Sequence, residues 1–149
     1  MKRILLAVLI CLFTAGLAFA QEKGAAKEAQ NMVDKAIAFY KANGAEKALA
    51  EISNPAGQFI KGNVYVFIWG TDYVVKAHPT NTKLIGKSMK DLKDTDGKQF
   101  VFDGVELAKA KGSGWVDYKY TNPVSKKIEA KTTYVKKVDD LVFVCGIYK

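Results

Sequence analysis

The C-terminal segment of this chain constrains its fold most, because it holds three strand-like runs separated only by short turns. Residues 114–120, 127–137 and 141–148 are rich in β-branched and aromatic residues, a composition that favours strands. Asn122-Pro123 and Asp139-Asp140 mark the turns between them. Connections this short join antiparallel neighbours, so the segment predicts a three-stranded antiparallel meander.

The N-terminal part of the chain is predicted to be helical. Within residues 24–42, apolar side chains recur at three- and four-residue steps, and charged residues fill the other positions. Gly44 ends this helix, since glycine adopts the left-handed conformation without steric cost. A second, short helix is predicted over residues 45–52. It stops before Pro55, whose ring disfavours helical backbone in the preceding residue.

After residue 62, the spacing of apolar side chains changes from three- and four-residue steps to the two-residue alternation of β-strands. Residues 63–69 and 73–77 are predicted to be two strands, joined by the turn Gly70-Thr71-Asp72. Alternate residues of the first strand form two apolar faces, made up of Val64, Val66 and Ile68 on one side and Tyr65, Phe67 and Trp69 on the other. A strand that is apolar on both faces is predicted to be central and covered twice.

Residues 78–98 are rich in turn-forming residues, with a short helix predicted from Ser88 to Leu92. A longer helix is predicted over residues 99–111, with Gly112 as its end. The order is therefore two helices, a hairpin, a loop with helices and a meander. This order predicts an α+β fold, in which an antiparallel sheet of about five strands accompanies a long N-terminal helix.

The first twenty residues have the layout of a secretory signal peptide. A positive start at Lys2 and Arg3 precedes an apolar stretch, and Ala18-Phe19-Ala20 forms an A-x-A cleavage site. Cleavage predicts a periplasmic or secreted protein made of residues 21–149, which is the length of one domain. The alternative is a membrane tether formed by an uncleaved helix, because residues 4–20 are about the shortest stretch that spans a bilayer.

Charge and cysteine content argue against several classes of protein. The full chain carries a net charge of +8, and removal of Lys2 and Arg3 leaves 21 basic against 15 acidic residues, a net +6. The lysines are scattered along the chain, which favours a solvated surface, and export argues against nucleic acid as a partner. Cys145 is the one cysteine left after cleavage. No internal disulfide is therefore expected, and the apolar neighbours of Cys145 predict a buried thiol.

The sequence carries no metal-binding or catalytic motif. Asp94-Thr95-Asp96-Gly97 imitates the middle of an EF-hand loop, but Leu92 and Asp103 stand where that loop needs its first and last ligands. A turn is therefore predicted. His78 is the single histidine, and it cannot build a zinc site that needs three or four ligands. Without a Ser/His/Asp neighbourhood or a phosphate-cradling glycine loop, the chain is expected to be neither an enzyme nor a cofactor-dependent protein.

Several stretches occur in the order typical of the single Cache domain type 2 family. Trp69-Gly70-Thr71-Asp72 with Val75-Lys76-Ala77-His78-Pro79 resembles that family's strand, aspartate turn and AHP step. The segment from Asp94 to Phe100 resembles its D-x-x-G-x-x-F motif. Gly114-Trp115-Val116-Asp117-Tyr118 and Gly146-Ile147-Tyr148 close the pattern.

The resemblance spans nearly all of residues 30–149 and implies a PAS-like sheet with a small-molecule pocket on one face. Members of this family form the sensing part of chemoreceptors and histidine kinases, often for short carboxylates. The chain ends at Lys149, where receptor members continue into a membrane helix, so it resembles the stand-alone exported members. Signalling would then pass through a membrane partner such as a receptor, a histidine kinase or a transporter.

The resemblance places candidate ligand-binding residues on the C-terminal strands, at Tyr118, Tyr120, Lys131 and Tyr134. Tyrosine hydroxyls and a lysine ammonium suit a carboxylate, because the rings exclude water and charge-assisted bonds orient the anion. Strand alternation puts Lys131 and Tyr134 on opposite faces unless a bulge intervenes. The alternative is that the tyrosines pack the sheet and that Lys131 lies on the surface.

His78 and Trp69 complete the candidate site. His78 is either structural or a pocket donor, and Trp69 either floors the pocket or packs the core. The expected function is the binding and sensing of a small anionic ligand, such as a short carboxylate, outside the cytoplasm. The alternative is an interaction module that docks on a kinase, receptor or transporter without binding a ligand of its own.

Overall fold

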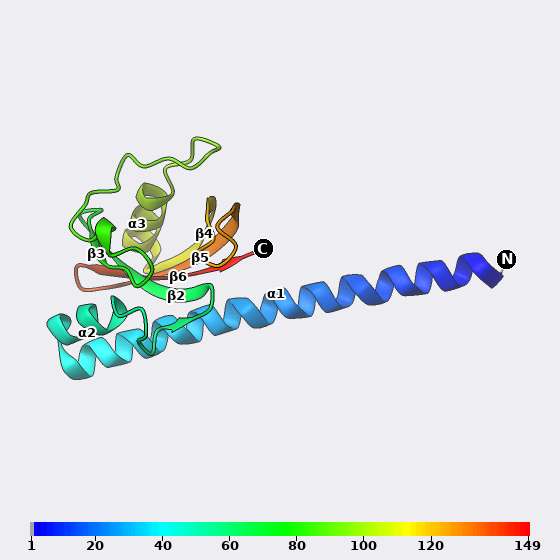
Figure 1. The fold of residues 1–149 in the computed structure, drawn as a ribbon, viewed down its shortest axis with the longest axis horizontal. Helices are drawn as coiled ribbons and strands as arrows, with labels where there is room; N and C mark the ends of the chain where they lie inside the picture. Colours follow the sequence, from blue (N-terminus) through cyan, green and yellow to red (C-terminus); the bar gives the residue numbers. More distant parts are fainter. Residues whose placement is uncertain (1) are drawn as a thin grey trace.

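An antiparallel sheet of six strands lies between two helical layers (Figure 1). This computed structural model describes the backbone of residues 2–149, and the side chains of residue 21 and residues 23–149. One face of the sheet is covered by helices α1 (Lys2–Asn43) and α2 (Ala45–Ile52). The other is covered by helix α3 (Phe100–Lys111) and by the loop of residues 78–99, termed the closing loop. The expected α+β class is confirmed, with six strands in place of about five.

The strands are β1 (Ile60–Lys61), β2 (Val64–Gly70), β3 (Val75–Ala77), β4 (Ser113–Thr121), β5 (Ile128–Val138) and β6 (Leu141–Tyr148). Their order across the sheet is β1-β2-β6-β5-β4, and β3 pairs with the same edge of β2 as β1. The predicted C-terminal meander is confirmed, and its last strand inserts between β2 and β5. Strand β1 escapes sequence prediction because two residues are too few to show an alternating pattern.

Strand β2 is central and covered on both faces, as its two apolar faces predict. Ile68 belongs to a buried cluster with Val33 of α1 and Phe143 of β6. Trp69, the next residue, belongs to a second cluster with Val101 of α3. Successive strand residues point to opposite faces, so one strand contributes to two separate cores.

Helix α1 begins at Lys2, whereas the sequence predicts a helix from residue 24. The predicted signal peptide, residues 1–20, lies outside the described side chains and stays a prediction. Among the residues whose side chains are described, no helix is both long and apolar enough to cross a membrane. Helix α2 and the end of α1 at Asn43 agree with the sequence analysis.

The helix predicted from Ser88 to Leu92 is wrong. Ser88 instead forms an isolated antiparallel bridge with Val74, which keeps this part of the closing loop extended beside the hairpin. A single 3-10 turn occurs earlier in the loop, at Thr82–Leu84. Tertiary pairing with the hairpin has therefore overridden the weak local helix signal.

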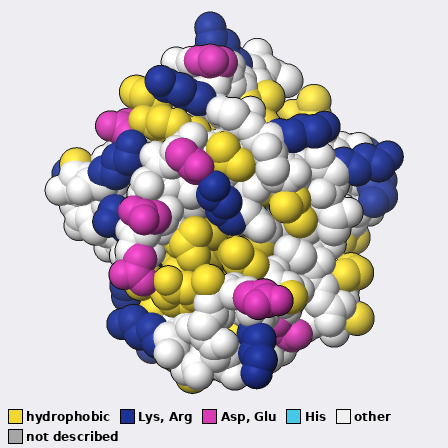
Figure 2. All heavy atoms as spheres, turned by 90° about the vertical axis from the view of Figure 1, so that its left-hand side faces the viewer, with side chains coloured by type: hydrophobic (Ala, Val, Ile, Leu, Met, Phe, Trp, Pro, Cys, Tyr) yellow, Lys and Arg dark blue, Asp and Glu magenta, His cyan; other side chains and the backbone are white. Residues whose placement is uncertain are grey.

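Charged side chains are dispersed over the surface, as their scatter along the sequence predicts. Figure 2 shows one face, seen from the α2 end of the molecule, on which lysines alternate with Asp and Glu side chains. Two ion pairs join the sheet to helix α1: Lys61 of β1 pairs with Glu28 at 2.8 Å, and Lys136 of β5 pairs with Asp34 at 2.8 Å. Exposed pairs of this kind contribute at most about 1 kcal/mol each, so the two apolar clusters dominate stability.

Gly104 lets α3 pack closely on the sheet, because a β-carbon there would lie 2.8 Å from Cζ3 of Trp69. We expect Gly104→Ala to lower the free energy of unfolding. Overpacking costs about 1–3 kcal/mol, and better helix propensity offsets about 1 kcal/mol of that loss. Equilibrium urea unfolding at pH 7 measures the difference.

Gly24→Ala in α1 is the matched control, since the methyl group that it adds has no atom within 4 Å apart from its chain neighbours and the nearby backbone of its own helix. This variant is expected to keep its stability or to gain up to about 1 kcal/mol. Equal stability of the two variants would contradict the close contact between α3 and Trp69.

Candidate functional site

A small cavity lies on the α3 face of the sheet, beneath the closing loop. Its volume is about 20 Å³, which is room for about one water molecule. Strands β2, β4 and β5, helix α3 and the closing loop all contribute to its walls. The lining residues are Tyr65, Phe67, Trp69, Val75, His78, Leu84, Met89, Leu92, Phe100, Val101, Tyr118, Tyr120 and Lys131.

Lys131 of β5 brings a positive charge into this cavity. Its side chain is 2 % exposed, and its Nζ donates a hydrogen bond to the hydroxyl of Tyr65 at 3.1 Å. No acidic side chain is among the lining residues. A buried charge without an opposite charge is costly.

Aromatic rings from three strands surround the Lys131 ammonium. Its Nζ lies 4.6 Å from the ring centre of Tyr65, 4.7 Å from that of Tyr148, 5.2 Å from that of Phe67 and 5.7 Å from that of Tyr120. Cation–π attraction of this kind is worth about 0.5–2 kcal/mol per contact. The rings therefore replace part of the lost hydration and leave ammonium donors available to a ligand, since an ammonium has three.

Gly146 of β6 makes room for this lysine. A β-carbon at Gly146 would overlap Cε of Lys131 and would lie 2.7 Å from Oγ1 of Thr133. Gly146 pairs with Tyr65 on one side and with Thr133 on the other, so the lysine side chain crosses bare backbone to reach Tyr65. Glycine inside a strand weakens the strand and often marks a close approach, which here is the approach of Lys131.

Tyr118 and Tyr120 of β4 form one wall of the cavity. Tyr118 stacks on Phe100, with ring centres 4.1 Å apart and planes within 5°. Its hydroxyl accepts a hydrogen bond from Oγ1 of Thr133 at 3.1 Å. Burial raises the pKa of Tyr118 and also that of Tyr120, so both phenols remain protonated and add no negative charge beside Lys131.

His78 forms the wall where β3 passes into the closing loop. Burial, and after it the charge of Lys131, lowers the pKa of His78 to about 4, so the ring is neutral at pH 7. Its Nδ1 accepts a hydrogen bond from the Asn81 backbone N–H at 3.1 Å, which assigns the remaining proton to Nε2. His78 therefore holds the start of the closing loop and offers a donor without adding a second charge.

The structure brings together five of the six sequence-predicted residues, which are Trp69, His78, Tyr118, Tyr120 and Lys131. Tyr134 does not line the cavity, because it lies on the opposite face of the sheet in the cluster with α1. The register of β4 against β5 runs without a bulge from Thr121 to Ser113. Lys131 and Tyr134, three residues apart, therefore point to opposite faces.

Three of the aromatic partners of Lys131 are not predicted from the sequence, namely Tyr65, Phe67 and Tyr148. The alternating pattern of β2 does place Tyr65 and Phe67 on one face. Their meeting with Lys131 depends on the register of β2 against β6, in which Tyr65 pairs with Gly146. A glycine within an otherwise apolar strand is the sequence signal that marks this crossing point.

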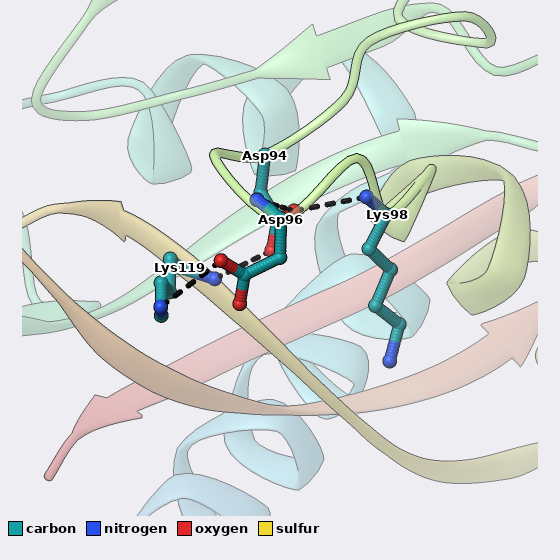
Figure 3. A network of polar contacts seen from close by, with 4 residues as sticks. All are labelled: Asp94, Asp96, Lys98 and Lys119. Atoms are coloured by element: carbon teal, nitrogen blue, oxygen red, sulfur yellow. Dashed lines mark hydrogen bonds and ion pairs between the residues drawn. The ribbon is translucent and has the colours of Figure 1, made fainter.

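Asp94 fastens the end of the closing loop to β4 (Figure 3). Its Oδ1 accepts hydrogen bonds from the N–H groups of Asp96 and Lys98, each at 2.9 Å, and its Oδ2 accepts one from the Lys119 N–H at 2.9 Å. These hydrogen bonds lower the pKa of Asp94, and the bond from the Lys119 N–H has the largest effect. Both carboxylate oxygens are thus occupied by amide donors, and the segment is a turn, as predicted.

Comparisons with known proteins identify the family and the fold. A family model described as "Cache domain" (dCache_2) matches residues 22–148. The periplasmic sensor domain of a chemotaxis protein is 25 % identical, with a TM-score of 0.66, over 87 % of this chain and 93 % of that chain. A Cache chemosensory domain described for carboxylic acid recognition is 28 % identical, with a TM-score of 0.65, over 82 % and 86 %.

A methyl-accepting chemotaxis protein from Vibrio parahaemolyticus shares the fold. Its TM-score is 0.74 at 19 % identity, and the superposition covers 85 % of this chain and 89 % of that chain.

Lys131→Met is expected to stabilise the ligand-free domain. Methionine has a similar length without the charge, and replacing buried charges by apolar groups is often stabilising by about 1–4 kcal/mol. Urea unfolding in buffer without carboxylic acids measures the change. Lys137→Met, at an exposed position of the same strand, is the control and should change stability by less than about 0.5 kcal/mol. A Lys131→Met variant less stable than this control would contradict the prediction.

His78 is expected to make stability depend on pH. Its pKa is 6.5 in the unfolded chain and about 4 in the fold, so between these values the unfolded state binds more protons. The stabilisation is complete above pH 6.5 and is lost as the pH falls toward 4. Urea unfolding should show a loss of about 2 kcal/mol between pH 7 and pH 5.

His78→Asn keeps a side-chain acceptor and removes the titration. In this variant, the free energy of unfolding should fall much less between pH 7 and pH 5, since the chain contains no other histidine. An equal loss in both proteins would show that other groups cause it.

Proposed function

Because the chain belongs to the Cache domain family, we propose that it is an extracytoplasmic sensor domain whose cavity binds a short monocarboxylic acid. The observation that carries this proposal is the buried ammonium of Lys131, held by aromatic rings and without an acidic neighbour among the lining residues. A carboxylate at this point would supply the missing opposite charge. Charge-assisted hydrogen bonds of this type are short and about twice as strong as neutral ones.

The charge of the site favours a single carboxylate. Lys131 brings a positive charge, whereas burial keeps His78 neutral and the phenols of Tyr118 and Tyr120 protonated at pH 7. A monoanion would make the cavity neutral, while a second buried carboxylate would lack an opposite charge. The Nε2–H of His78 and the tyrosine hydroxyls are further donors for the carboxylate oxygens.

The size of the cavity favours a small ligand. About one water fits in it, and its sheet side is built from side chains that are almost fully buried, such as Tyr65 and Trp69. Space for an acid must therefore come from the closing loop. The relative described for carboxylic acid recognition supports the same class of ligand.

A sensor domain of this kind passes its state to a partner, and we place that partner in the membrane. The neighbours that are chemotaxis proteins support this part of the proposal. A receptor, a histidine kinase or a transporter would read the position of the closing loop.

Thermal unfolding with acetate, propionate, pyruvate and lactate tests the binding step. A ligand at a hundredfold excess over its Kd adds about 2.7 kcal/mol, and each kcal/mol raises Tm by roughly 3–6 °C in a domain of this size. At least one of these acids should therefore raise Tm by about 8 °C or more. The corresponding primary amides, which lack the charge, should not.

Two variants locate the binding site. Lys131→Met should abolish the shift, and Gly146→Ala should reduce it strongly, because a β-carbon there displaces the lysine side chain. Lys137→Met should keep the full shift. A folded protein without any shift would favour an interaction module that binds no ligand, and in that case a membrane pull-down should succeed equally with Lys131→Met.

A further inference from the structure

A surface groove lies directly outside the cavity. It has a volume of about 150 Å³ and lies between residues 92–95 of the closing loop and the outer ends of β4 and β5. Leu92, Phe100 and Tyr120 line the groove and the cavity alike. These three side chains therefore form the partition between the two spaces.

Two members of the partition are held firmly. Phe100 is 4 % exposed and stacks on Tyr118 with planes within 5°. Tyr120 lies edge-on against Phe100, with ring centres 5.8 Å apart, and its ring centre is 5.7 Å from the Lys131 ammonium. Moving either ring would break several aromatic contacts at once.

Leu92 is the partition residue that is held least. Its side chain is 38 % exposed, although it lines a cavity whose other walls are largely buried. The loop before it is fixed by the hydrogen bond from the Met89 N–H to the Tyr73 carbonyl at 2.9 Å, and the loop after it by Asp94. Within the described part of the chain, the backbone of residues 90–93 makes one hydrogen bond, from the Leu92 N–H to the Met89 carbonyl at 3.2 Å.

We infer that Leu92 determines which chain length the site accepts, by separating the cavity from the groove. This inference rests on the proposed binding of monocarboxylic acids. Lys131 on the rigid sheet would hold the carboxylate. The additional carbons of a longer acid would then extend toward Leu92, the partition side chain that is held least. Beyond it the groove offers apolar surface on Phe100, Tyr120 and Ile128, so removal of the Leu92 side chain would join the two spaces into one elongated apolar site.

Titration calorimetry with the straight-chain acids from acetate to hexanoate tests the inference. In the wild-type protein, affinity should fall once the chain exceeds the length that the closed cavity holds. In Leu92→Ala, affinity should instead keep rising through the longer acids, by about fourfold in Kd for each added methylene. The preferred acid should therefore be longer than that of the wild type by two or more carbons.

Two controls separate this effect from a general loosening of the loop. Ile85→Ala truncates another apolar side chain of the closing loop, 39 % exposed, that lines neither space. Leu92→Met keeps an apolar side chain of similar volume at the partition. Both variants should prefer the same acid as the wild type. If Leu92→Ala also keeps that preference, the inference is overturned while the proposed function stands.

A second measurement covers the case in which the wild type binds no acid, so that the proposed function fails. Crystals of the wild type and of Leu92→Ala under xenon pressure would then report the apolar space directly, without any carboxylate. Xenon that bridges cavity and groove only in Leu92→Ala would support the role of Leu92 as the partition. Identical xenon sites in both crystals would overturn it.

Discussion

The buried ammonium of Lys131 is the constraint on which the rest of the site depends. A lysine in this place needs a residue without a side chain beneath its aliphatic chain, aromatic rings around its ammonium group, and shielding from solvent. Gly146 supplies the first, Tyr65 and Tyr148 contribute to the second, and the closing loop supplies the third. A core built for stability alone would need none of these, because replacement of such charges by apolar groups is often stabilising. Under the proposed function, the aromatic density of the α3 face therefore reflects binding more than packing.

The two faces of the sheet differ in the buried groups that they carry. On the α1 face, apolar side chains such as Val33, Ile68 and Phe143 fill the core and leave the sheet well supported. The α3 face carries a comparable apolar cluster, but it also holds Lys131 and His78. Successive residues of β2 and β6 point to opposite faces, so the same two strands contribute to both clusters. Within the stability of the whole domain, apolar burial on the α1 face offsets the cost of the buried polar groups on the α3 face.

Local signals predicted most of the fold, and long-range register decided the rest. Helix α2, helix α3 and the meander follow from period and turn residues, which act within a few positions of the chain. The false helix at Ser88 arose where pairing with Val74 outweighs local preference. Family resemblance placed Lys131 together with Tyr118 and Tyr120, whereas Tyr65 and Tyr148 join them only through the pairing of β6 with its neighbours. Gly146 marks the crossing point in the sequence, but it does not say which strands meet there.

Under the proposed function, the small volume of the cavity makes ligand binding and loop movement inseparable. An acid larger than a water molecule has to displace lining side chains, and the sheet side cannot yield without breaking contacts such as the stack of Phe100 on Tyr118. The closing loop is fixed at its start through His78 and at its end through Asp94, so the displacement concentrates on the stretch between residues 90 and 93. Under the proposed function, the ligand favours a conformation in which residues 90–93 have moved. The size of this population shift is set by how much more tightly the ligand binds that conformation than the closed one. Occupancy of a buried charge is thereby converted into a change of shape at the surface, where a partner can read it.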